Sequence, residues 1–94
     1  MNDKEREILV IAQEECAEVI QEISKCFRFG IHNQHKSGIT HRAKLEEEVG
    51  DLLCMIDLMV KHNLIDEKNV QAAKEKKVDK LLVFSNIFVD SDDK

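Results

Sequence analysis

The sequence predicts an all-α protein with three main helices. We expect these helices to form an antiparallel helical bundle that is completed by oligomerisation. Apolar residues recur with a period close to that of an α-helix along most of the chain. The 94 residues include no proline and only three glycines, so little in the sequence interrupts a helix. A chain of this length buries only a small core, and we therefore expect a homo-oligomer, either a dimer or a tetramer.

The first two helices have recognisable ends. The first is predicted from about residue 3 to residue 29, with Asn2 as its N-terminal cap and Gly30 as its stop. The second is predicted from about residue 41 to residue 62, with Thr40 as its cap. We expect these two helices to form a hairpin.

The third helix is predicted to begin after the cap Asp66 and to continue to about Phe88. Residues 30–40 have no helical periodicity and predict a mobile connection, and residues 90–94 predict a frayed polar tail. We expect the whole chain, residues 1–94, to be a single domain.

The overall charge and hydropathy exclude several functions. The formal net charge of −5 argues against nonspecific nucleic-acid binding, which needs a basic surface. No apolar run approaches the length of a membrane span, and the acidic start does not resemble a signal peptide. Three cysteines without paired spacing indicate reduced thiols, so we expect a cytoplasmic protein without a nucleic-acid or membrane partner.

Two pairs of acidic residues fall on helix faces that charged side chains normally avoid. Glu15 lies inside the apolar stripe of the first helix, and Glu18 lies at the edge of that stripe. Glu48 lies inside the stripe of the second helix, with Asp51 at the same edge. The stripes comprise Ile8, Ala12, Val19, Ile23 and Cys26 in the first helix and Leu45, Leu52, Ile56 and Met59 in the second.

The two acidic pairs are predicted to face each other. Glu18 precedes the end of the first helix by roughly 16 Å, and Glu48 follows the start of the second by roughly 10 Å, at 1.5 Å per residue. The connection can absorb this difference in an antiparallel hairpin. Four facing carboxylates repel one another unless a cation lies between them, and oxygen ligands suit magnesium or manganese.

The third helix carries lysines that could bind an anionic ligand. Lys77 interrupts an apolar stripe formed by Val70, Ala73, Leu81, Phe84 and Phe88, and Lys74 and Lys80 lie beside it. Lysines of this kind usually extend into solvent along an apolar surface. Beside an acidic metal site, however, Lys74 and Lys77 become candidates for binding phosphate.

Three histidines lie in or beside the connection between the first two helices. The spacings of His32, His35 and His41 match no usual zinc pattern. Two interpretations of this segment stay open: a loop exposed to solvent, or a loop that covers a substrate.

The acidic motifs resemble those of a known family. Glu14-Glu15-x-x-Glu18, followed after a spacer by Glu48-x-x-Asp51, is similar to the signature of the MazG-like all-α nucleoside triphosphate pyrophosphohydrolases. The flanking segments also resemble short phage-type members of this family; they are residues 14–21, Ser24-Lys25, Arg28-Phe29-Gly30 and residues 45–53. The resemblance covers about residues 8–84.

The resemblance implies an oligomeric helical bundle that binds magnesium, with manganese as a substitute. It implies hydrolysis of a nucleoside triphosphate to a monophosphate and pyrophosphate. The residues that correspond to metal ligands are Glu15, Glu18, Glu48 and Asp51, and Glu14 matches a further catalytic glutamate that orients water or another ligand.

Further along the first helix, Lys25 and Arg28 are candidates for phosphate contact. Many relatives have an Asn-x-Lys-type motif with a following arginine in the third helix, whereas this chain has only Lys74, Lys77 and Lys80. The base and sugar preference therefore stay open.

Two alternative functions stay open beside this one. Phosphoribosyl-ATP pyrophosphohydrolases have a similar fold and acidic helices, although Ser24-Lys25 and Arg28-Phe29-Gly30 favour the MazG-like branch. A non-enzymatic helical interaction or regulatory module would leave the acidic side chains solvated and indifferent to magnesium. A di-iron carboxylate bundle is disfavoured because no histidine follows Glu18 or Glu48 at the required spacing.

Overall fold

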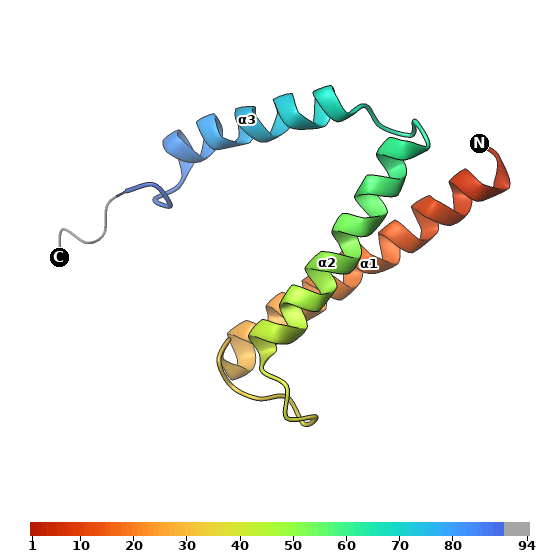
Figure 1. Ribbon diagram of the computed structural model, residues 1–94. Coiled ribbons are helices and arrows are strands. Elements are labelled where there is room, and N and C mark those ends of the chain that lie inside the picture. The colour runs from red at the N-terminus through yellow and green to blue at the C-terminus, as the bar shows by residue number, and fades with distance from the viewer. Residues whose placement is uncertain (90–94) are drawn as a thin grey trace. The chain divides into compact units, whose positions relative to one another are not determined.

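The computed structural model describes residues 1–89 and contains three helices, α1 (Asp3–Phe29), α2 (His41–Lys61) and α3 (Glu67–Phe84) (Figure 1). No strand occurs among these residues, so the all-α prediction is confirmed. The chain divides into two compact units, residues 1–64 and a second unit that begins at Ile65. None of the three helices has an apolar stretch of the length that crossing a bilayer requires.

Helix α1 begins with a reciprocal pair of hydrogen bonds. The Glu5 N–H donates to Asn2 Oδ1 at 2.8 Å, and the Asn2 N–H donates to Glu5 Oε1 at 2.9 Å. This capping box satisfies backbone donors that the first turn of a helix leaves free. The helix ends at Gly30, whose φ of 92° lies where L side chains are strained. The predicted ends of α1 are therefore confirmed.

Helix α2 begins where the sequence indicates and ends one residue earlier than predicted, at Lys61. Thr40 Oγ1 accepts from the Ala43 N–H at 3.1 Å and caps the first turn. At the other end, Asn63 has a left-handed φ of 59°, and the Leu64 N–H donates to the Met59 carbonyl at 2.9 Å. This arrangement closes the helix with backbone hydrogen bonds.

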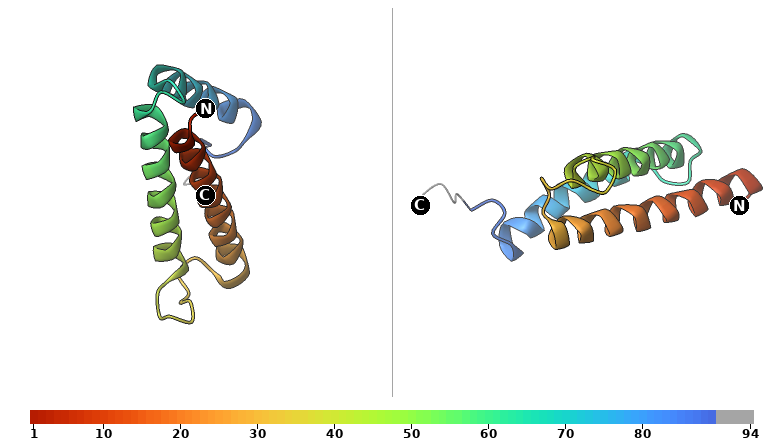
Figure 2. Two further views of the ribbon diagram at one scale, coloured as in Figure 1. Left: turned by 90° about the vertical axis from the view of Figure 1, so that its right-hand side faces the viewer. Right: turned by 90° about the horizontal axis from the view of Figure 1, so that it is seen from below.

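The first unit is an antiparallel hairpin in which α1 and α2 lie side by side (Figures 1 and 2). Its buried apolar core is small and consists of Ile8, Ala12 and Met55. Four partly buried residues pack against this core: Ile11, Leu58, Met59 and Leu64. Little apolar burial therefore stabilises this unit by itself, and its outer faces remain available to other surfaces.

The inward faces of both helices follow an alternating spacing of three and four residues. All positions on these faces are buried or partly buried: Ile8, Ala12, Glu15, Val19, Glu22 and Cys26 on α1, and His41, Leu45, Glu48, Leu52, Met55 and Met59 on α2. We call these positions the seam. The predicted stripe on α1 was wrong at one place, because Ile23 is 42% exposed and Glu22 is only 3% exposed.

The connection between α1 and α2 is a closed, hydrogen-bonded loop. Gln34 and Thr40 form an isolated antiparallel bridge, and the Gly38 N–H donates to the His35 carbonyl at 2.9 Å. The His41 N–H donates to the Asn33 carbonyl at 2.9 Å, which ties the loop to the first residue of α2. The loop thus brings His35 back toward the end of the hairpin.

In the second unit, Asp66 caps α3 by accepting from the Lys68 and Asn69 N–H groups at 2.8 and 3.2 Å. The predicted extension of this helix to Phe88 was wrong, since α3 ends at Phe84. Ser85 takes an extended conformation, and its N–H and Oγ both donate to the Leu81 carbonyl, at 3.0 and 2.7 Å. The side chain of a serine competes with helical hydrogen bonding in this way. The predicted tail, residues 90–94, lies outside the described residues.

Candidate metal centre

Three of the four predicted ligands converge between α1 and α2. Glu15, Glu48 and Asp51 each place a carboxylate oxygen within 4.8 Å of the others. No other group of three or more potential ligands of this kind comes together in the part of the chain that the structure describes. The donor set contains oxygen alone, which suits a hard divalent cation better than zinc or copper.

The two helices present these carboxylates in the same way. Glu15 and Glu48 occupy the seam and are partly buried, whereas Glu18 and Asp51 lie three residues further along their helices and are exposed. Residues three apart lie on neighbouring positions of one helix face. The sequence therefore predicted correctly which acid of each pair points inward.

The pKa values of the two inward glutamates are raised. For Glu15 the main cause is desolvation, followed by repulsion from Asp51, Glu18 and Glu14, and together they raise its pKa above the usual 4.5. For Glu48 desolvation again comes first in raising the pKa, followed by Glu18 and then Asp51. Glu18 is thus close enough to raise the pKa values of both Glu15 and Glu48, although it is outside the group of three carboxylates within 4.8 Å. A cation at this position would relieve the repulsion.

The remaining candidate residues have different surroundings. Glu14 is exposed and has the smallest effect on the pKa of Glu15 among the three acidic neighbours that raise it. Lys25 Nζ pairs with Glu22 Oε2 at 3.3 Å, and the Arg28 guanidinium lies 4.9 Å from the centre of the Phe29 ring. Both basic residues lie near the loop end of the hairpin.

Lys74 and Lys77 are exposed on α3, three residues apart on one face. They belong to the second unit, whose helix carries no buried residue. Their phosphate-binding role stays a prediction.

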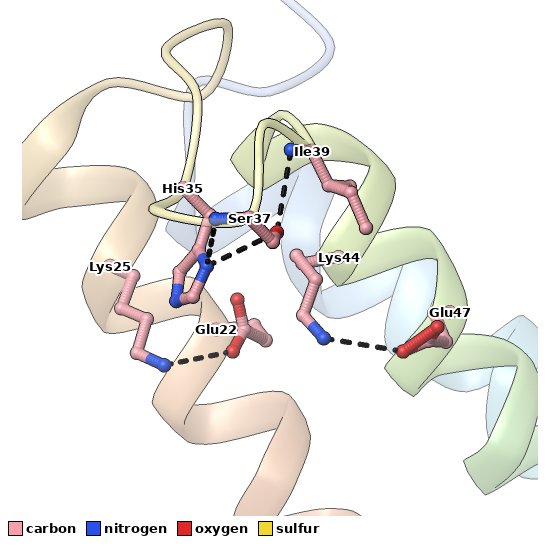
Figure 3. Close-up of polar contacts among 7 residues, drawn as sticks. All are labelled: Glu22, Lys25, His35, Ser37, Ile39, Lys44 and Glu47. Carbon is pink, nitrogen blue, oxygen red and sulfur yellow. Dashed lines mark hydrogen bonds and ion pairs between the residues drawn. The ribbon is translucent and has the colours of Figure 1, made fainter.

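The sequence analysis missed Glu22, which is the most deeply buried acidic residue of the hairpin. It follows Glu15 by seven residues and is only 3% exposed, and its Oε1 has no hydrogen-bond partner among residues 1–89. Figure 3 shows its pairing with Lys25 and the ring of His35 on the same side of α1. The alternating three-and-four spacing was the signal that could have found it, had the acidic residues been counted with the apolar ones.

No protein-family model matches this chain, and no match is found among curated proteins or solved structures.

Proposed function

We propose that this chain is a magnesium-dependent nucleoside triphosphate pyrophosphohydrolase that works as a homo-oligomer. Water attacks the α-phosphorus, the bond to the bridging oxygen of the β-phosphate breaks, and a nucleoside monophosphate and pyrophosphate leave. The observation that carries the proposal is the convergence of Glu15, Glu48 and Asp51 from two helices, with oxygen atoms within 4.8 Å. The resemblance of the two acidic motifs to those of MazG-like enzymes adds to it.

Each acidic residue has a role in this proposal. Glu15, Glu48 and Asp51 would hold magnesium, which manganese could replace, and Glu18 at the edge of α1 would be a further ligand. Bound magnesium supplies charge that neutralises triphosphate oxygens and makes water easier to deprotonate. Glu14, which is exposed and precedes Glu15 in the sequence, would accept a hydrogen bond from water. No covalent intermediate with a protein side chain is required.

The raised pKa values support a cation in this place. Desolvation and the nearby carboxylates raise the pKa values of Glu15 and Glu48. Ionising these two side chains is therefore unfavourable in the folded protein without a metal. A cation that binds only the folded state reverses this effect and stabilises the protein by mass action. Magnesium or manganese should therefore raise the melting temperature, and calorimetry with each metal measures the change.

The test of activity is a panel of ribo- and deoxyribonucleoside triphosphates with magnesium, with products separated as monophosphate plus pyrophosphate. Phosphoribosyl-ATP belongs in the panel because it distinguishes the related pyrophosphohydrolase reaction. Glu48→Gln preserves size and removes the charge, so activity should fall by at least about 100-fold. The matched control is Glu47→Gln, since Glu47 is exposed and pairs with Lys44, at 3.4 Å.

Equal activity in wild type and Glu48→Gln would contradict the proposal, as would loss in Glu47→Gln alone. A protein that hydrolyses none of the substrates and does not respond to magnesium would favour the alternative, a helical interaction module. That alternative is consistent with the many exposed apolar residues of the outer faces, among them Ile20 and Phe27 at 67% and 86% exposure.

A further inference from the structure

A pocket of about 530 Å³ lies at the loop end of the hairpin. Its walls come from the end of α1, from the loop and from the first residue of α2, all within the first unit. Three of its lining residues are basic, Lys25, Arg28 and Lys36, and no carboxylate is among the lining residues. In a chain with a net charge of −5, this is a local concentration of positive charge that favours an anion.

Two imidazoles add to this lining. His41 is 2% exposed, and its Nδ1 has no hydrogen-bond partner in the part of the chain that the structure describes. His35 meets it edge-on, with ring centres 5.9 Å apart. A buried polar atom without a partner is rare in folded proteins and often marks a place that water, an ion or a ligand completes. His41 therefore places a buried, unsatisfied polar side chain in the wall of this pocket.

The aromatic rings argue against a nucleobase in the pocket. His41 stacks on Phe29 with ring centres 5.4 Å apart and an angle of 17° between the rings, and the Arg28 guanidinium also lies over Phe29. These contacts occupy the flat surfaces on which a base would stack. Charged and hydrogen-bonding groups remain for an anion of high charge density.

Glu22 acts here as a positioning residue. Its Oε2 accepts one hydrogen bond from Lys25 Nζ, at 3.3 Å, which leaves the ammonium group two further donors for a ligand (Figure 3). Because Glu22 is buried, the pair holds Lys25 at the wall of the pocket. Along α1, Glu18 and Lys25 are two turns apart, about 10 Å. A triphosphate together with an extended lysine side chain spans that separation.

We propose that this pocket binds the pyrophosphoryl end of the nucleoside triphosphate, with Arg28 and Lys25 as its principal cations. The inference rests on the proposed function for the identity of the substrate, whereas the pocket itself can be tested without hydrolysis. Pyrophosphate alone is the probe, titrated into the full chain in EDTA with calorimetry and with the histidine ring signals followed by NMR.

Wild type is expected to bind pyrophosphate more tightly than orthophosphate or a nucleoside monophosphate, and the His41 signals should shift. Arg28→Gln should weaken binding by at least about tenfold. The double variant Glu22→Gln with Lys25→Gln neutralises the buried pair as a unit, and it should weaken binding similarly without leaving a lone buried charge. Arg42→Gln is the matched control, because Arg42 is exposed near the pocket without lining it.

An equal loss of binding in Arg42→Gln and Arg28→Gln would overturn the proposal, since it would indicate attraction by the general field. Equal affinity for orthophosphate and pyrophosphate would also overturn it. Glu48→Gln should still bind pyrophosphate, because Glu48 belongs to the candidate metal centre and does not line the pocket. Binding that persists in a protein without hydrolase activity would contradict the proposed function and leave the anion pocket standing. Hydrolysis without pyrophosphate binding would contradict the anion pocket and leave the proposed function standing.

Discussion

Glu22 lies two helical turns beyond Glu15 on the inward face of α1 and is the more deeply buried of the two glutamates. Only one of its carboxylate oxygens has a partner, the Lys25 ammonium. A buried charge held by one weak pair contributes little to stability and can reduce it. Its position on the seam fits a role in holding Lys25.

Replacing Glu22 should therefore stabilise the metal-free protein. Glu22→Leu removes an unpaired buried oxygen and adds apolar packing, so the free energy of unfolding should rise by about 1 kcal/mol. Urea unfolding at a fixed protein concentration measures the change. The control Gln21→Leu, at an exposed position of the same helix, should stay within about 0.5 kcal/mol of wild type. A decrease of more than about 1 kcal/mol in Glu22→Leu would contradict this account of the pair.

The stability of the metal-free protein should also depend on Glu48 in a definite direction of pH. Because the pKa of Glu48 is raised in the folded state, folding favours the protonated carboxyl. Below a pH of 4.5, the pKa of Glu48 in the unfolded chain, Glu48 does not reduce the stability of the fold. The loss of stability develops as the pH rises from this value through the raised pKa of the folded state. The stability of Glu48→Gln relative to wild type should therefore increase over this range and then level off.

Urea unfolding in EDTA at a series of pH values tests this prediction. Glu47→Gln should show no comparable trend, because Glu47 is an exposed residue paired with Lys44. A difference between Glu48→Gln and wild type that shrinks as the pH rises would show that Glu48 is stabilised in its ionised form.

How much of this site the sequence could predict depends on the residue. The helix ends of α1, the inward positions of Glu15 and Glu48, and the edge positions of Glu18 and Asp51 follow from caps and helical periodicity, which are local properties. The inward position of Glu22 follows from the same spacing once acidic residues are counted with the apolar ones. The pocket around His41 could not be found in that way, because it depends on how the loop folds back on the hairpin, and the loop has no periodicity to interpret. At the early end of α3 the Ser85 hydroxyl donates to the same Leu81 carbonyl as the Ser85 N–H, a local contact that helical periodicity does not reveal.

The oligomer remains a prediction, and the structure suggests a surface for it. Each helix of the hairpin carries a second apolar stripe beside the seam: Ile20, Ile23 and Phe27 on α1, and Val49, Leu53, Ile56 and Val60 on α2. Ile20 is 67% exposed and Leu53 is 54% exposed. Leu64 is not part of this surface, because it packs against the hairpin core.

Ile20→Asp should weaken self-association by at least about tenfold, because it places a charge in an apolar contact. The hairpin should stay folded, since Ile20 makes no part of its core. Light scattering over a micromolar concentration series measures the effect, and Gln21→Asp is the neighbouring control. A monomeric wild type at these concentrations would contradict the prediction.

The two glycines of the loop region should respond differently to alanine. Both have positive φ angles, 92° for Gly30 and 86° for Gly38, so each substitution should cost about 1–2 kcal/mol in strain. At Gly30 the added Cβ would also lie 2.8 Å from Asn33 Nδ2, which donates to the Phe29 carbonyl. Moving Asn33 sacrifices that hydrogen bond, at about 1 kcal/mol.

Thermal unfolding of Gly30→Ala and Gly38→Ala compares the two costs directly. Gly38→Ala meets no atom within 4 Å and serves as the control for strain alone. Equal destabilisation in the two variants would indicate that the Asn33 hydrogen bond contributes nothing. Pyrophosphate titration of Gly30→Ala should in addition reveal weaker binding, because Asn33 lines the pocket.

The alternating spacing of the seam has a consequence for how the two helices align. A hairpin that preserves this spacing can shift only by whole heptads. A shift in one direction would bring Glu22 level with Glu48 and Glu15 level with Met55, and a shift in the other would bring Ile8 level with Glu48. Both place a carboxylate against an apolar side chain, which is costly. The observed alignment instead keeps Ile8, Ala12 and Met55 in one layer and Glu15, Glu48 and Asp51 in another. The acidic residues thus disfavour both shifted registers of the hairpin, as single polar residues do in coiled coils.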